Sequence, residues 1–294
     1  MPYVLKRFDV NPGIKVDDFL VQTVKLESSL AMKLLQKGRI VDDKKRRLQK
    51  GFVLKSGFIE VSIYEPITKG LKPIFQTEHF VIFDKPSGLI VHPNARSNKY
   101  TLLDEIRYQF GNEAKLVHRI DAETSGLVLV SKNQYSHFVL SSMFEEKEFV
   151  KKYQALIEGE IKEEILINKK ITNSSGLINI KMKTSNEGKE SSTLIKPILY
   201  DKRKNQTLVE ATPFTGRQHQ IRVHLDSIGH RIVGDPIYGL DEVFVDKILK
   251  KEVSLEERIK ITGEKRLMLH AYYLEFEFLN RTYKFCSKQK FAEE

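Results

Sequence analysis

The sequence predicts an α+β protein in two parts: a small N-terminal α+β module and a larger domain built on a largely antiparallel sheet. Strand patterns outnumber helical patterns, and most neighbouring strand patterns are separated by turns of hairpin length. Two lysines, Gly70 and two flanking prolines interrupt these patterns early in the chain, as in a linker. We therefore expect a first module at residues 1–66, a linker at 67–75 and the larger domain at 76–294.

Two helical patterns followed by short strand patterns make up the first module. Val16–Val24 places its apolar residues on one helical face, and Ser28 and Ser29 can cap a second helix that ends before Gly38. That second helix would bury a stripe made of Leu30, Leu34 and Leu35. Phe58–Tyr64 alternates as a strand does. These elements offer too little core for much independent stability.

The larger domain alternates between strand and helix patterns. Its strand patterns lie at His79–Asp84, Leu89–Val91, Leu127–Val130, Phe149–Gly159, Ile178–Met182, Ser192–Tyr200, Thr207–Ala211, Leu269–Leu279 and Thr282–Cys286. Its helical patterns lie at Leu102–Phe110, Asn133–Phe144 and from a capping box at Thr215 and Gln218 to Ile228. The highly charged segment Asp241–Lys265 is expected to be a helix-bearing surface insertion.

Charge favours a polyanionic partner. The net charge is +10 and the pI is near 9.3, which suits nucleic acid or an acidic membrane surface. Residues 1–66 hold 13 Lys and Arg against 8 Asp and Glu, so half of the excess charge lies in this short part. A solvated run of charge without a binding role is the alternative interpretation.

The sequence also favours a cytoplasmic protein. The single cysteine, Cys286, excludes an intramolecular disulfide and a Cys-cluster zinc site. Met1–Leu30 lacks the uninterrupted apolar core of a signal peptide, and no run approaches the length of a membrane span. We expect no membrane contact.

The stretch His118–Lys132, which reads HRIDAETSGLVLVSK, organises the larger domain. Leu127–Val130 has the length and composition of a buried strand. Asp121 therefore lies at the edge of a core, where a cleft can form. A surface ion pair between Arg119 and Asp121 is the alternative, and such a pair would contribute almost nothing to stability.

This stretch resembles a motif of the RluA family of RNA pseudouridine synthases. FDKPSGLIVHP (Phe83–Pro93) lies upstream, and GRQHQIRVHLDSIGHRIVGDPIYG (Gly216–Gly239) lies downstream; both resemble further motifs of that family, in the same order. The resemblance implies an isomerase that converts specific uridines to pseudouridine, with Asp121 as its catalytic residue. It also implies a catalytic domain with a mixed sheet split by a central, basic cleft.

Two further catalytic residues follow from the resemblance. Tyr153, in the family's Lys-Tyr-x-Ala motif, would lie on a sheet beside Asp121; a core tyrosine with a bonded hydroxyl is the alternative. Arg222, in Gln-Ile-Arg-Val-His, would turn into the cleft against Asp121, where it would keep the carboxylate ionised and aimed. An Arg222–Asp226 surface pair at helical spacing is the alternative for the arginine.

The first module resembles the small alpha-L RNA-binding motif (the S-four-type module). The chain departs from that motif at Asp42-Asp43-Lys44, where the family has an Asn-Gly turn. The RNA-binding candidates in the module are Lys33, Lys37, Arg39, Lys44, Lys45, Arg46 and Arg47. Those near the catalytic motifs are His118, Arg119, Arg217 and His219, and Arg119 is the candidate to fill the gap left by a flipped-out base.

No cofactor is expected. The sequence has no Gly-rich phosphate loop, dinucleotide fingerprint or metal-ligand cluster, and His219 and His224 are five residues apart, off one helical face. Pseudouridine formation is redox-neutral and suits side-chain chemistry alone. The Asp121 carboxylate can attack the anomeric carbon, add to the uracil ring or deprotonate the sugar, and the sequence does not choose among these.

Other functions are weaker. A glycoside hydrolase using Asp121 and Glu123 is disfavoured, because these carboxylates are only two residues apart and the chain has no Trp for a sugar platform. A non-catalytic RNA-binding ribosome-assembly factor would be expected to lack Asp121, Tyr153 or Arg222. Large-subunit ribosomal RNA is favoured over transfer RNA as the partner, and we expect a monomer without a small-molecule cofactor.

Overall fold

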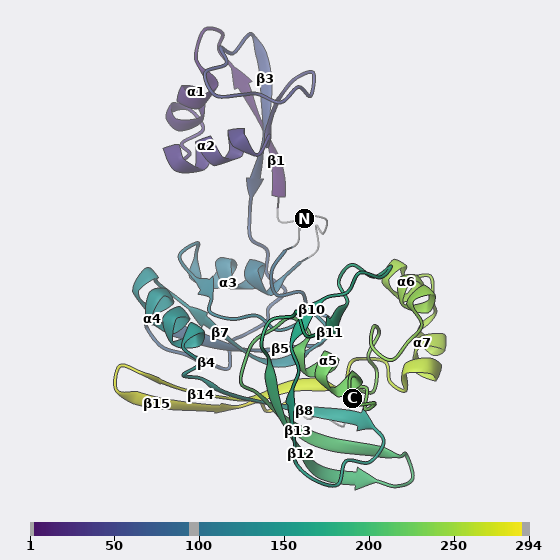
Figure 1. The fold of residues 1–294 in the computed structure, drawn as a ribbon. Coiled ribbons are helices and arrows are strands. Elements are labelled where there is room, and N and C mark those ends of the chain that lie inside the picture. Colours follow the sequence, from purple (N-terminus) through teal and green to yellow (C-terminus); the bar gives the residue numbers. More distant parts are fainter. Residues whose placement is uncertain (1–2, 94–99, 290–294) are drawn as a thin grey trace. The chain divides into compact units, whose positions relative to one another are not determined.

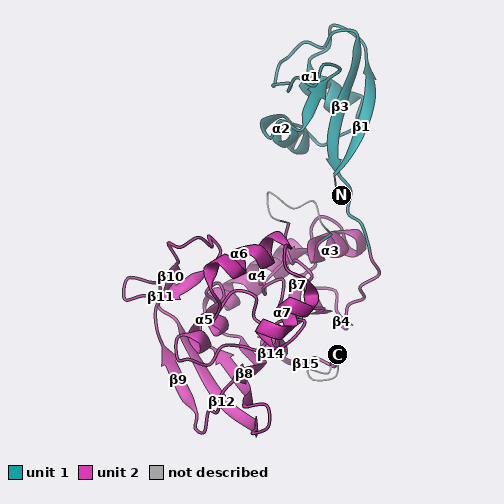
Figure 2. Ribbon diagram, turned by 90° about the vertical axis from the view of Figure 1, so that its right-hand side faces the viewer, with its two compact units in different colours: residues 1–68, 95–100 teal, residues 69–94, 101–294 magenta. Residues whose placement is uncertain are grey.

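The computed structural model describes residues 3–93 and 100–289. The chain divides into two compact units, one made of residues 1–68 and 95–100 and the other of residues 69–94 and 101–294 (Figure 2). Each unit has its own hydrophobic core, so each is described by itself.

The first unit packs two helices on a small antiparallel sheet with the order β1-β3-β2 (Figure 1). Its elements are β1 (Tyr3–Val10), α1 (Val16–Gln22), α2 (Ser28–Gln36), β2 (Ile40–Asp42) and β3 (Gly57–Tyr64). Strand β1 was not predicted, because most of its side chains are exposed and its sequence does not alternate cleanly. Its pairing with β3 nevertheless covers the whole length of both strands.

Helix α2 corrects two expectations. Leu34 and Leu35 are buried as predicted, but Leu30 is 40 % exposed and Ala31 takes its place in the core. Ser28 is already helical, and the residue before it, Glu27, caps the helix without a side-chain hydrogen bond. Gly38 follows the helix with a φ of +60°, the left-handed conformation that ends many helices.

The second unit is built on one long mixed sheet. Its elements are β4 (Phe75–Gln76), β5 (Phe80–Lys85), α3 (Leu102–Phe110), β6 (Lys115–Leu116), β7 (Ser125–Ser131), α4 (Gln134–Glu145), β8 (Val150–Glu158), β9 (Ile165–Asn168), β10 (Ile171–Asn173), β11 (Met182–Thr184), β12 (Ser192–Asp201), β13 (Gln206–Pro213), α5 (Gln220–Asp226), α6 (Glu242–Lys250), α7 (Leu255–Thr262), β14 (Leu269–Phe278) and β15 (Arg281–Cys286).

The strands of this sheet follow the order β4-β5-β7-β14-β8-β13-β12-β9, with β6 beside β7 and β15 beside β14. Among the described strands, β7 and β14 are the only parallel pair, and only two residues of each strand take part. The pairing is close: a Cβ on Gly126 would lie 2.3 Å from the carbonyl oxygen of Ala271, so only glycine fits there. The predicted α+β class with a mixed, largely antiparallel sheet is confirmed.

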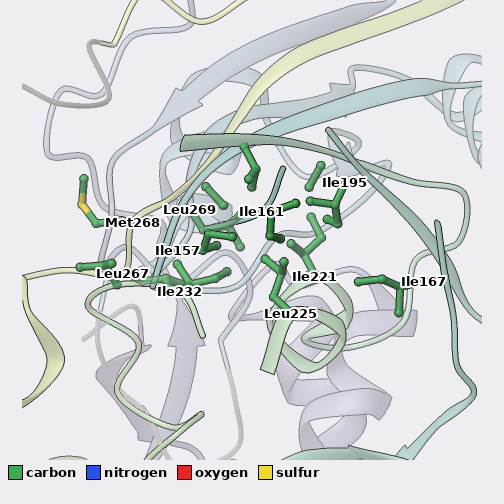
Figure 3. Packing of buried hydrophobic residues seen from close by; sticks show 14 residues of the cluster. Ile157, Ile161, Ile167, Ile195, Ile221, Leu225, Ile232, Leu267, Met268 and Leu269 are labelled. Atoms are coloured by element: carbon green, nitrogen blue, oxygen red, sulfur yellow. The ribbon is translucent and has the colours of Figure 1, made fainter. Parts of the chain in front are cut away.

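Both halves of the sheet are anchored by apolar cores. Strand β7 is buried along its whole length, because Leu127 and Leu129 pack into one cluster and Val128 and Val130 into another on the opposite face. In the other half, Ile221 and Leu225 of α5 pack against the sheet residues Ile157 and Ile195, among others (Figure 3). This contact holds α5 at one end of the pocket described below.

Three predicted elements are wrong. Leu89–Val91 is not a strand, although the carbonyl groups of Ile90 and Val91 accept hydrogen bonds from the start of α3. The strand predicted at Ile178–Met182 lies instead at Met182–Thr184, as β11.

The third error is the start of α5. No capping box forms at Thr215, because the Thr215 hydroxyl donates to Gln220 Oε1 at 2.6 Å. The helix begins only at Gln220, after His219 in a left-handed conformation, and ends at Asp226.

The charged segment Asp241–Lys265 carries two helices, α6 and α7, as predicted. The chain then closes with the predicted β14–β15 hairpin, whose turn is formed by Leu279 and Asn280 with positive φ. None of the described helices is long and apolar enough to cross a membrane.

Candidate active site

A pocket of about 940 Å³ opens where β8, α5 and the loop before β7 meet. The charged side chains in its described lining are the cations Arg107, Lys115, Arg119, Lys151, Arg217 and Arg222 and one carboxylate, Asp121. A wall with this excess of positive charge favours a polyanionic ligand. Among the described residues, no group of three His, Cys, Asp or Glu side chains is close enough to hold a metal ion.

Asp121 lies on the loop between β6 and β7, at the edge of the buried strand. Its side chain is 26 % exposed, so the carboxylate is reachable from the pocket. Arg222 Nη1 donates a hydrogen bond to Asp121 Oδ2 at 3.1 Å, and His219 Nε2 lies 3.8 Å from the same oxygen. Both neighbours therefore approach one carboxylate oxygen and leave Oδ1 as the oxygen available to a ligand.

The backbone that follows Asp121 is held by a turn from another part of the chain. Lys85 Nζ donates to the carbonyl oxygens of Pro86, Leu89 and Ala122, each at 2.9 Å. Gly88 N–H also donates to Ala122 O, and the Ser87 hydroxyl donates to Glu123 O at 2.6 Å. The three donors fix the loop on its carbonyl side, which limits the positions that the Asp121 side chain can reach.

Lys85 was missed by sequence reasoning. The signal was a lysine directly after the apolar strand Phe80–Asp84 and before a Pro-Ser-Gly turn. Its side chain is fully buried, and burial lowers the pKa of its ammonium to about 7, partly opposed by Glu123 and Asp121.

Arg222 is fully enclosed and bound by two carboxylates. Its Nε and Nη2 each donate to an oxygen of Asp235 at 2.8 Å, so that this pair is bidentate. Asp235 is itself buried and also accepts the N–H groups of Ile237 and Tyr238. The third side-chain hydrogen bond of Arg222 goes to Asp121, and the alternative surface pair with Asp226 is wrong.

Arg222 and Asp235 keep each other charged inside the fold. Burial alone would raise the pKa of Asp235, but Arg222 outweighs burial and holds it below its ordinary value. Burial would likewise lower the pKa of Arg222, yet Asp235 and Asp121 raise it. Asp235 was missed from the sequence, although it lies in the quoted string Gly-Asp-Pro-Ile-Tyr-Gly.

Tyr153 and His219 both line the pocket near Asp121. Tyr153 is half-buried on β8; burial and, secondarily, the Asp121 charge raise the pKa of its phenol, so it is neutral. Burial and then Arg222 lower the pKa of His219 to about 4. His219 Nδ1 lies 2.9 Å from the Tyr238 hydroxyl, which accepts the N–H of Met182. Tyr238 therefore has its own proton to give to Nδ1, which leaves a proton on Nε2, the nitrogen nearest Asp121.

His118 lines the pocket and is at the same time held inside the fold. It is buried and stacks on Phe144, with ring centroids 5.0 Å apart, and its Nε2 accepts the backbone N–H of Leu129. Burial lowers the pKa of His118 to about 3, so the ring is neutral. These contacts give His118 a structural role in supporting β7, and its contact with RNA stays a prediction.

Apart from His219, whose side chain is only 9 % exposed, the other RNA-binding candidates are exposed. Arg119 lines the pocket, and Arg217 does so while its Nε donates to the Glu190 carbonyl at 3.1 Å. In the first unit the candidates are all exposed: Lys33, Lys37, Arg39, Lys44, Lys45, Arg46 and Arg47. Of these, Lys45 pairs with Glu60, and Arg46 pairs with Asp42.

Comparison with known proteins connects this geometry to one group of enzymes. Residues 79–227 match the RNA pseudouridylate synthase family. An uncharacterized RNA pseudouridine synthase of Helicobacter pylori strain J99 is 34 % identical over 290 residues, covering 98 % of this chain and 96 % of that protein. The ribosomal large subunit pseudouridine synthase C of Haemophilus ducreyi is 30 % identical over 293 residues, covering 92 % of this chain and 86 % of that protein.

A solved structure agrees with these relatives. Human RNA pseudouridylate synthase domain containing 1 superposes with a TM-score of 0.59 at 25 % identity, covering 76 % of this chain and 86 % of that one. The matched family region contains Asp121, Tyr153 and Arg222, while Asp235 lies a few residues beyond it.

Proposed function

The chain belongs to the RluA family of RNA pseudouridine synthases and is an isomerase, and from this premise we propose that it modifies uridines of large-subunit ribosomal RNA in the cytoplasm, with Asp121 as nucleophile and no cofactor. The observation that carries the proposal is the Asp121 carboxylate, held by Arg222 at the floor of a basic pocket. The name of the Haemophilus relative supports the ribosomal substrate.

Asp121 is the proposed reactive group because its carboxylate is paired with Arg222, is reachable from the pocket and is held in one orientation. Arg222 and His219 approach Oδ2, so Oδ1 is the oxygen that would meet the nucleotide. The bond from the sugar to uracil nitrogen is broken and a bond to uracil carbon is made, without net oxidation or reduction. A carboxylate can begin this exchange at the sugar or at the base, and both routes use the same oxygen.

Tyr153 is proposed to pack against the flipped uracil. Its phenol is neutral and stands on β8, in the lining of the pocket. A neutral phenol can give or take a proton while it stacks on the base. Arg119, exposed at the rim two residues before Asp121, is proposed to occupy the gap that the uridine leaves in the RNA.

Residues 1–66 are proposed to form a separate alpha-L RNA-binding module, with residues 76–294 as the catalytic domain. The support is the set of surface cations on and after α2 and the separate core of this unit. This module holds none of the proposed chemistry, so it would add affinity without setting the rate of the chemical step.

A single reaction tests the proposal. Purified protein, a metal chelator and an unmodified large-subunit rRNA transcript are combined, and product is mapped by carbodiimide and primer extension. Pseudouridine at discrete positions is expected, and a parallel arm with unmodified transfer RNA is expected to give none. Product only on transfer RNA, or an absolute need for metal or nucleotide, would contradict the proposal. Ribosomal assembly intermediates serve as the substrate if naked rRNA is inert.

The non-catalytic alternative is tested in cells. If the protein acts only as an assembly factor, a deletion strain regains normal ribosomes when it receives Asp121→Asn. If the proposal holds, that strain lacks the same pseudouridines as the deletion.

A further inference from the structure

Strand β8 presents two consecutive lysines to opposite faces of the sheet, because side chains alternate along a strand. Lys152 Nζ forms an ion pair with Glu210 of β13 at 3.1 Å. Lys151 is turned the other way and lines the pocket, on the same side of the strand as Tyr153. The two neighbours therefore have the same chemistry and different surroundings.

The surroundings of Lys151 are apolar and uncharged. Its Nζ lies 4.4 Å from the centroid of the Phe144 ring, and Phe144 stacks on the neutral His118. Within residues 3–93 and 100–289, no carboxylate forms an ion pair with Lys151. Burial lowers the pKa of its ammonium to about 8, which means that the pocket holds this charge at a cost that a bound anion would offset.

The described lining of the pocket offers no free carboxylate to pair with the Lys151 ammonium. Asp121 is the one carboxylate in the described lining, and Arg222 already donates to it. A ligand must therefore bring the negative charge. Lys151 and Tyr153 are two residues apart on one face of a strand, a separation of about 7 Å. That distance is within reach of the phosphates that flank a single nucleotide.

We propose that Lys151 binds a backbone phosphate beside the uridine that Asp121 attacks, and so fixes the position of that nucleotide along the strand. The inference rests on the proposed function, because it takes the uridine to be bound at Asp121. The packing of Phe144 against the lysine restricts the ammonium to one part of the pocket, which favours a defined contact over general attraction to RNA.

The test compares Lys151→Met with Lys152→Met, its matched control on the opposite face. Both changes are made in Asp121→Asn protein, which prevents turnover. Binding is measured over a salt series with an RNA oligonucleotide that spans a uridine modified by the wild-type protein. Lys151→Met is expected to reduce the slope of log K against log salt by about 0.7 to 0.9, the effect of leaving one phosphate without its neutralising cation. Lys152→Met should keep the slope of its parent, and Lys151→Arg should restore it.

A second arm locates the phosphate. Methylphosphonate linkages, which carry no charge, replace the phosphates around the uridine one at a time. One replacement should weaken the parent protein and leave Lys151→Met unaffected. Weaker binding of Lys151→Met with an unchanged slope would mean a contact to the base and would overturn the proposal, as would equal sensitivity of both proteins at every linkage. Failure of the proposed function is seen separately, as absence of product with wild-type protein.

Discussion

The cations of the first unit and those around Asp121 differ in how they are held. Lys33, Lys37 and their neighbours are exposed, and two of these neighbours, Lys45 and Arg46, pair with the largely covered carboxylates of Glu60 and Asp42. Arg222 is enclosed between two aspartates, and Lys151 is packed on an aromatic ring. Exposed charges contribute little to stability and are screened by salt, whereas buried charges need a fixed partner. The first set can therefore supply affinity for RNA, and the second can supply position.

The largest effect on activity should come from Asp121→Asn. This variant tests whether a correctly placed side chain without a carboxylate still supports turnover. The amide keeps the shape and a hydrogen-bond acceptor for Arg222 but removes the carboxylate that is the proposed nucleophile. We expect activity to fall by at least about a thousandfold, a barrier increase of about 4 kcal/mol. Folding and RNA affinity should remain nearly normal, as checked by thermal melts and binding assays.

The matched control for that change is Glu123→Gln. The Glu123 carboxylate lies 3.6 Å from Arg258 and is 36 % exposed, so its ion pair contributes little. Its backbone carbonyl, which Ser87 holds, is unchanged by the substitution. Tritium release from uracil-labelled RNA measures both variants. Turnover of Asp121→Asn within about tenfold of wild type would show that Asp121 is not the nucleophile.

Asp235→Asn should have the next largest effect, because it removes the partner that orients Arg222. One amide group cannot accept both N–H bonds, so a buried donor loses its acceptor. We expect the free energy of unfolding to fall by about 3 kcal/mol and kcat to fall by about 10- to 100-fold, about 1.4 to 2.7 kcal/mol. Asp226→Asn, on the same helix as Arg222 but not paired with it, should change kcat less than threefold. Denaturant melts and rate measurements compare the two variants. If Asp235→Asn and Asp226→Asn have equal effects, Asp235 does not orient Arg222.

The pH dependence of stability tests whether Asp235 stabilises the fold through its charge. The pKa of Asp235 in the folded protein lies below its ordinary value of 3.8. A carboxyl with a depressed pKa stabilises the fold above its unfolded pKa, and that contribution disappears as pH falls through the folded pKa. The difference in unfolding free energy between wild type and Asp235→Asn should therefore be constant above about pH 5 and shrink below about pH 4. A difference that stays constant into acid would assign the loss to packing.

The smallest effects should come from the surface set. Lys33→Gln and Lys37→Gln together should weaken RNA binding a few-fold at moderate salt and reduce the salt slope by about 0.7 to 0.9 for each phosphate that is no longer neutralised. The rate at saturating RNA should be unchanged. Arg46→Gln is the control, because Arg46 is already paired with Asp42. If kcat at saturation falls with the lysines, the division between affinity and position is wrong.

Sequence reasoning succeeded where local pattern decides structure. The apolar run Leu127–Val130 had the length and composition of a buried strand, which β7 confirms, and the position of Asp121 at its edge followed from that. It failed where the deciding contact is remote. The start of α5 is set by Gln220, whose amide donates to Ser192 O and Thr193 Oγ1 on β12. No local capping rule contains that information.

The pairing of site residues was also partly beyond the sequence. The resemblance implied the contact of Arg222 with Asp121, and helical spacing offered Asp226 as the alternative partner. Neither pointed to its second partner, Asp235, which lies after a turn that brings the chain back. Sequence reasoning did not distinguish Lys85 from a surface lysine. Only the fold shows that its ammonium donates to three carbonyl groups. In each case the contact follows from tertiary packing, which a single sequence does not display.

Strand β14 has a consequence for how the enzyme is made. It lies between β7, which follows the Asp121 loop, and β8, which carries Tyr153. Ser125 and its strand partner His270 are 145 positions apart, so this pairing forms late during synthesis. A nascent chain with residues 269–278 still inside the ribosome has β7 and β8 but not the strand that lies between them. On the proposed function, the strands that flank Asp121 and carry Tyr153 are therefore joined through β14 only late in synthesis.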